Sequence, residues 1–121
     1  MRCCNPFAKL HREAATLVSA GAHIKLGGGD APYVAEWFNN VNSAVPTVSL
    51  VNGVYVVDFG FSTANRFPVV VMDRNLDQSV RRPGMPHVFL SGNQVSVQVI
   101  DPGTMWYTAG EFYLTLLAGN Y

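Results

Sequence analysis

Two adjacent cysteines, Cys3 and Cys4, are the first residues in the sequence that could bind a metal or carry redox chemistry. A structural zinc site needs four ligands, so His11 and His23 or His87 would have to complete it. Adjacent side chains seldom point at the same ion, and the pair lacks the Cys-x-x-Cys spacing of redox motifs. Palmitoylation near an N-terminus needs a second membrane signal, which the sequence lacks. We therefore expect both thiols to pack against a neighbouring subunit or the sheet.

The three histidines could also serve as general bases in hydrolysis. A catalytic triad needs a serine that a histidine activates and a carboxylate that orients the histidine. The sequence contains no Gly-x-Ser-x-Gly elbow or other recognisable nucleophile context. We therefore predict that the protein is not an enzyme and has no catalytic residues.

Two stretches resemble ligand-binding loops without completing either pattern. Residues 27–30, Gly-Gly-Gly-Asp, lack the Gly-Lys-Ser/Thr ending of a phosphate loop, and a hinge explains them better. Residues 73–77 match the first three side-chain positions of a calcium loop, but Gln78 replaces the turn glycine and Gly84 replaces the bidentate glutamate. We therefore predict a polar loop between strands, with no metal and no cofactor.

Arginines gather in one proline-containing stretch of the sequence. Arg74, Arg81 and Arg82 are three of the eight basic residues, and the prolines that follow predict an extended loop. On a lone molecule this stretch would be a solvated loop. In an assembly its guanidinium groups could bind carboxylates of an acidic neighbour.

Met105, Trp106 and Tyr107 follow a Pro-Gly turn, which places two aromatic side chains at a loop tip. Trp and Tyr often anchor protein interfaces and stack on sugars. Three interpretations stay open: an interface anchor, a glycan platform, or a plug in which Trp106 closes one end of the fold. The candidate interface residues are Cys3, Cys4, Phe7, Arg74, Arg81, Arg82, Met105, Trp106 and Tyr107.

The composition predicts a single small domain whose surface is covered by partners. The chain has 121 residues, of which 49% are hydrophobic and 13% are charged, and eight basic residues balance eight acidic ones. Nucleic acid binding needs a concentrated basic face, which a neutral chain does not predict. The sequence contains no apolar run long enough to span a membrane and no signal peptide. We expect synthesis in the cytoplasm and a place inside an assembly.

Residues 1–46 are expected to form an N-terminal helix or extended arm. Asn5 and Pro6 suit a helix start, because Asn caps free backbone N–H groups and Pro fits the first helical position. Apolar residues then recur at helical spacing and predict a helix over residues 6–20. These residues are Phe7, Leu10, Ala14, Leu17 and Val18.

An alternative for the same segment makes residues 14–19 and 22–26 short strands, because apolar residues alternate in the second of them. The apolar positions of residues 33–41 suit one or two further helical turns. The sequence alone leaves helix and strand open before residue 47.

Residues 47–121 alternate with the period of two that is typical of strands. Asn52 and Gly53 tolerate positive φ and predict a hairpin turn. After it, Tyr55, Val57, Phe59 and Phe61 share one face and should point into the core. We therefore predict a mainly β fold, an antiparallel, jelly-roll-like β-sandwich over residues 47–121 that forms a single domain with the N-terminal segment. The further strands expected are 67–72, 88–90, 95–100 and 112–118.

The order of four segments resembles that of small β-sandwich modules of tailed bacteriophages. Capsid decoration (cement) proteins, the receptor-binding tips of tail fibres and H-type lectin domains share this style. The resemblance covers about residues 47–121 and transfers no functional residue to this chain. The segments are "GVYVVDFGF", "RFPVVVM", "NQVSVQVID" and "EFYLTLLAGNY".

The resemblance implies a structural virion protein that is assembled in the host cytoplasm. The separate segment before residue 47 favours a free-standing capsid decoration or cement protein over a fibre tip, because arms can lie along neighbouring subunits. The expected partners are the major capsid protein or other virion subunits, with the chain itself a dimer or trimer, and neither nucleic acid nor membrane. The alternative is a glycan-binding module of lectin-like kind that uses Trp106 and Tyr107.

Overall fold

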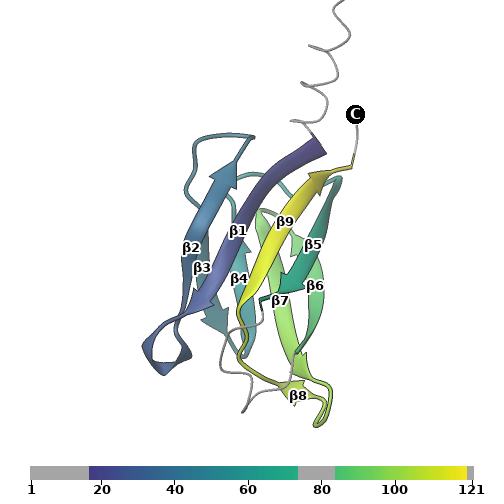
Figure 1. The fold of residues 1–121 in the computed structure, drawn as a ribbon. Coiled ribbons are helices and arrows are strands. Elements are labelled where there is room, and N and C mark those ends of the chain that lie inside the picture. The colour runs from purple at the N-terminus through teal and green to yellow at the C-terminus, as the bar shows by residue number, and fades with distance from the viewer. Residues whose placement is uncertain (1–16, 74–83, 120–121) are drawn as a thin grey trace, which may run out of the picture.

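The computed structural model describes residues 17–73 and 84–119, which form two antiparallel sheets packed as a β-sandwich (Figure 1). The order of sheet A is β2-β1-β9-β5, from Pro32–Asn39, Val18–Leu26, Phe112–Ala118 and Arg66–Met72. The order of sheet B is β3-β4-β7-β6, from Thr47–Val51, Val54–Asp58, Gln94–Asp101 and Met85–Ser91. A short strand, β8 (Trp106–Tyr107), pairs with β7, and a 3₁₀ turn, η1 (Gly28–Asp30), joins β1 to β2. The predicted mainly β, antiparallel sandwich is confirmed.

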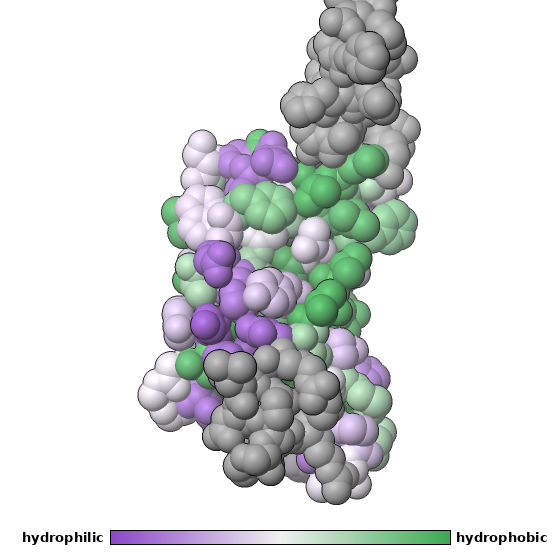
Figure 2. All heavy atoms as spheres, in the orientation of Figure 1, coloured by the Kyte–Doolittle hydropathy of each residue, from purple (hydrophilic) through white to green (hydrophobic). Residues whose placement is uncertain are grey.

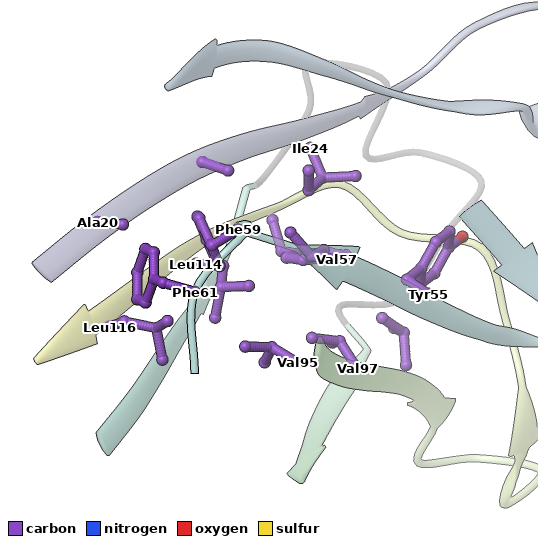
Figure 3. Packing of buried hydrophobic residues seen from close by; sticks show 13 residues of the cluster. Ala20, Ile24, Tyr55, Val57, Phe59, Phe61, Val95, Val97, Leu114 and Leu116 are labelled. Atoms are coloured by element: carbon purple, nitrogen blue, oxygen red, sulfur yellow. The ribbon is translucent and has the colours of Figure 1, made fainter. Parts of the chain in front are cut away.

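Alternating side chains of the central strands β1, β9, β4 and β7 form the core between the sheets (Figure 3). The inward residues of β4 and β7 come from Val-rich runs whose outward residues are polar or half-buried. The aromatic ring of Tyr55 meets that of Phe112 edge to face, with 5.5 Å between the ring centroids. The predicted inward set after the hairpin turn is confirmed, since all four of its members are buried: Tyr55, Val57, Phe59 and Phe61.

The hairpin between β3 and β4 has the predicted turn. Asn52 and Gly53 have φ angles of 51° and 82°, and Val51 pairs with Val54 across them. Both angles lie in the left-handed region that a type I′ turn requires and that Asn and Gly tolerate. This turn fixes the register that brings Val57 and Tyr55 to the core side.

The predicted helix over residues 6–20 is wrong for its last part, because β1 begins at Val18. The part of that prediction before Leu17 lies outside the described residues. Ala20, Ala22 and Ile24 are buried against the core from alternate positions of β1. Alanine favours helices in isolation, but the packing of this face against β9 and the opposite sheet overrides that preference. The alternative with two short strands is right for residues 22–26 but wrong in its break, because β1 continues from Val18 to Leu26.

The helical turns predicted within residues 33–41 are also wrong, because residues 32–39 form β2. A β-bulge explains the misleading pattern. The pairing of β2 with β1 shifts between His23 and Ile24, so His23 faces Glu36 while Ile24 faces Val34. The extra residue of a bulge changes the side of the sheet on which later residues fall. Apolar residues three positions apart, Val34 and Trp37, therefore share one side of a strand as they would share one face of a helix.

The sandwich starts earlier in the chain than residue 47, where the sequence analysis placed its beginning. Both β1 and β2 belong to sheet A and make up half of its strands. The segment expected to be a separate arm therefore supplies part of the core over residues 18–39.

Removal of a core side chain should test the inward face of sheet A. We expect Leu114→Ala to lower the free energy of unfolding by about 2 to 5 kcal/mol, because Leu114 is buried at the centre of β9 and its loss leaves a cavity. Val51→Ala on the edge strand β3 is the control, since Val51 is half exposed and its loss should cost less than about 1 kcal/mol. Urea titrations of the three proteins measure the difference. Equal losses in the two variants would contradict the assignment of the core.

Candidate functional site

Short-range hydrogen bonds shape the loop between β7 and β8. The Asp101 carboxylate accepts the Gly103 N–H at 2.7 Å, and the Asp101 carbonyl oxygen accepts the Met105 N–H at 2.7 Å. The Thr104 hydroxyl accepts the Trp106 N–H at 3.3 Å. The loop therefore has a defined conformation that fixes the direction of the residues after it.

This conformation exposes three large side chains, Met105, Trp106 and Tyr107, which we call the aromatic tip. Their exposed fractions are 64%, 73% and 45%. Figure 1 shows β8 at the end of the sandwich opposite the C-terminal end of β9. The interpretation in which Trp106 closes one end of the sandwich is therefore wrong, because a closing side chain would be buried.

Tyr107 is the fixed part of the aromatic tip. A Cβ atom at Gly53 would lie 2.5 Å from Cδ2 of Tyr107, so the ring lies directly over the glycine of the β3–β4 turn. The Gln98 side chain donates a hydrogen bond to the Tyr107 hydroxyl at 3.3 Å. The Trp106 ring lies 6.1 Å from the Tyr107 ring, tilted by 38°. One anchored ring thus supports an indole that projects into solvent.

Met105 itself has an unusual backbone conformation. Its φ is 58°, and the other described non-glycine residues with positive φ are Asp30, Asn52 and Asn65. Asp and Asn tolerate this region better than a side chain such as Met, which pays about 1 kcal/mol or more there. The sequence therefore keeps a large apolar side chain at a position where Gly or Asn would be less strained.

A second cluster lies on the outer side of sheet A around His23. Its Nε2 lies 2.7 Å from the Asp73 carboxylate, and its Nδ1 lies 3.3 Å from the Glu36 carboxylate. The Tyr113 ring stacks on the imidazole with 3.9 Å between ring centroids. The carbonyl oxygen of Glu111 accepts the Asp73 N–H at 2.9 Å, which positions the carboxylate.

The cluster is built to hold the imidazole in place. Both ring nitrogens of His23 face carboxylate oxygens, and both contacts are hydrogen bonds when each nitrogen carries a proton. His23 is buried, whereas the Glu36 side chain is largely exposed. A carboxylate lies against each ring nitrogen, so the arrangement joins β1, β2 and the end of β5.

The sequence indicates His23 as a candidate metal ligand or base, but it does not reveal the two carboxylates that contact the imidazole. Asp73 lies 50 residues away in sequence and Glu36 lies 13 away. Only the order of the strands in sheet A brings the three together. One signal in the sequence was available. In a strand, His23 must point to the other side of the sheet from its neighbours Ala22 and Ile24, which are buried in the core.

Six of the candidate interface residues lie outside the described residues: Cys3, Cys4, Phe7, Arg74, Arg81 and Arg82. The glycine stretch predicted to be a hinge is a tight link between paired strands, because the Gly27 N–H donates to the Ala31 carbonyl oxygen at 2.8 Å. His87 is exposed on β6.

In residues 17–73 and 84–119, no group of three or more His, Cys, Asp or Glu side chains is arranged to hold a metal ion.

Comparison with known proteins gives no relative: no protein-family model, no curated protein and no solved structure matches the chain. Within the described part of the chain, no helix has the length and apolar character needed to cross a membrane. A functional conclusion therefore depends on the exposed surfaces described above. Among these, the aromatic tip combines large exposed side chains with a loop conformation that hydrogen bonds fix.

Loss of the imidazole should destabilise the fold. We expect His23→Ala to lower the free energy of unfolding by about 1 to 3 kcal/mol, because it leaves the Asp73 carboxylate without its partner and uncovers the Tyr113 ring. His87→Ala is the matched control, since His87 is exposed and should change stability by less than about 0.5 kcal/mol. Denaturant midpoints of both variants measure the effect. A His23→Ala protein as stable as the wild type would show that the cluster does not support the sheet.

Proposed function

We propose that the protein is a non-enzymatic structural component of a virion, a bacteriophage capsid decoration or cement protein that binds the assembled shell and stabilises it. The observation that carries this proposal is the aromatic tip, a hydrogen-bonded loop that holds Trp106 in solvent beside an anchored Tyr107. The phage-like order of the β segments supports the virion setting.

The residue types of the aromatic tip suit a protein interface. Trp, Tyr and Met are enriched where proteins meet, and a few such anchors supply most of the binding energy. A tryptophan side chain buries up to about 250 Å² on full burial. At about 25 cal/mol per Å², covering the 73% of Trp106 that is exposed contributes at most roughly 4 to 5 kcal/mol before the costs of association are subtracted.

The strained backbone of Met105 supports the same role. A left-handed conformation at a large apolar residue reduces folding stability, so its presence favours a purpose outside the fold. In the proposed complex, the Met105 side chain adds an adaptable apolar contact beside the rigid indole.

Shell stabilisation follows from mass action. A protein that binds the assembled shell and not its separated subunits stabilises the shell by RT ln(1 + [L]/Kd) per site. No catalytic step and no cofactor is needed. The balance of eight basic and eight acidic residues leaves short-range packing, rather than long-range attraction, as the main source of affinity.

Rebinding to stripped particles tests the proposal. Purified particles are gently stripped of the protein and then supplied with wild type, Trp106→Ala or Phe89→Ala. We expect stripping to lower the thermal rupture temperature and the wild type to restore it. We expect Trp106→Ala to bind at least about 30-fold more weakly, a loss of about 2 kcal/mol. Phe89 is an exposed aromatic residue on β6 away from the tip, so Phe89→Ala should restore rupture resistance fully.

Three results would count against the role in the shell. The protein could be absent from purified particles, its removal could leave the rupture temperature unchanged, or Trp106→Ala could rebind as tightly as the wild type. Because Trp106 is largely exposed, its substitution should leave the free energy of unfolding within about 1 kcal/mol of the wild type. Urea titration of the variant separates weak binding from poor folding.

The second candidate function is glycan binding by a module of an adhesion or tail-fibre protein. The exposed face of Trp106, with Tyr107 beside it, favours this candidate, because sugars stack on accessible aromatic rings. A glycan array probed with wild type and Trp106→Ala distinguishes the two functions. Binding that disappears with the indole would support the glycan-binding module, whereas an array without wild-type binding leaves shell attachment as the function.

A further inference from the structure

The outer side of sheet A carries an apolar region on β5 and β9 and a more polar region on β1 and β2. Three successive outward residues of β5 are apolar and exposed, namely Phe67 at 61%, Val69 at 43% and Val71 at 58%. On β9, Leu117 pairs with Phe67 and extends the apolar surface. We call these four residues the apolar stripe. Figure 2 shows hydrophobic side chains gathered over β5 and β9, and mostly hydrophilic ones over β1 and β2.

The core does not account for the apolar stripe. The other side of β5 supplies Val70 and Met72, which pack against the buried cluster. An antiparallel sheet with one solvated side normally carries polar residues there. A contiguous apolar surface on that side is typical of a site that binds another protein.

Two features of β5 show that a partner would cover the face of the stripe rather than extend the sheet. The Asp73 N–H and the Asn65 carbonyl oxygen bond to Glu111 and Gly119, the residues on either side of β9. Every second residue between Asn65 and Asp73 therefore directs its backbone groups to the open edge. Pro68 is one of these residues and has no N–H to donate. Proline on an edge strand disfavours the addition of another strand.

A second copy of the chain fits this surface chemically. The apolar stripe contains no charged residue, so two stripes placed face to face bring no like charges together. A two-fold interface uses the same surface on both copies, which an uncharged apolar surface satisfies without any complementary partner. The neutral net charge of the whole chain adds no long-range repulsion between copies.

We propose that the protein self-associates through the apolar stripe, with the stripe of one copy covering that of a second copy. The aromatic tip lies on β8 of sheet B, at the end of the sandwich away from the start of β1 (Figure 1). Self-association therefore leaves the aromatic tip free. The inference does not depend on shell binding and holds for a glycan-binding module as well.

Sedimentation equilibrium of the purified protein at micromolar concentrations tests the proposal. We expect the wild type to have at least twice the 13.2 kDa mass of one chain. Val71→Glu places a charge in the apolar stripe and should give a monomer. Phe89→Glu introduces the same charge at a similarly exposed apolar position of sheet B and should keep the mass of the wild type.

A milder variant keeps the test decisive if Val71→Glu fails to fold. The double substitution Val69→Thr and Val71→Thr preserves side-chain shape and strand preference, and should raise the dissociation constant at least about tenfold, a loss of about 1.4 kcal/mol. Circular dichroism confirms that each variant is folded. A monomeric wild type, or folded stripe variants that associate as tightly as the wild type, would overturn the proposal. Neither result bears on the attachment of Trp106 to particles.

Discussion

Every strand of a two-layer sandwich can turn only alternate side chains toward the core, and the rest of this structure depends on that constraint. In β9, Phe112, Leu114 and Leu116 take the inward positions, and Ala20, Ala22 and Ile24 take them in the neighbouring β1. A slip of one residue in this pairing would turn the inward side chains of one of the two strands to the outside. The pairing of β1 with β9 therefore determines both the core and the composition of the outer surface.

Some outward positions of the sheets carry side chains that the stability of the fold does not require. On β1 and β2, the outward positions carry His23 and Glu36, which are engaged in a polar cluster. On β5, the outward positions carry Phe67 and Val71, which have no role in the core. The aromatic tip is a further example on the other sheet. These surfaces lie apart, so one molecule can associate with its own copies and still attach to a different partner.

Strands with strict alternation could be predicted from the sequence, and strands with irregular pairing could not. The inward face of the residues after the Asn52–Gly53 turn was identified correctly, and the alternation in residues 95–100 identified the strand β7, because pleating alone decides which side each residue occupies. β2 was missed because its bulge produces helix-like spacing. β1 was left open between helix and strand, because small alanines satisfy either structure and only the packing of its inward face in the core selects the strand.

The functional surfaces were predictable in part. Residue types alone identified Met105, Trp106 and Tyr107, but whether Trp106 is buried depends on how β8 pairs with β7 and rests on Gly53, which no local pattern encodes. The His23 cluster depends on contacts between segments 50 residues apart. The sequence predicted the residues of β5 as a strand. It did not predict the apolar stripe, because a continuous apolar run does not show which side of the strand faces away from the core.

The central claim is that the protein works by attaching exposed apolar side chains to other subunits. Electron cryomicroscopy of purified particles that carry the protein measures this most directly. The account predicts density for the sandwich on the shell with Trp106 enclosed by a shell subunit. A map in which the sandwich is absent, or in which Trp106 faces solvent while another surface makes the contact, would contradict it.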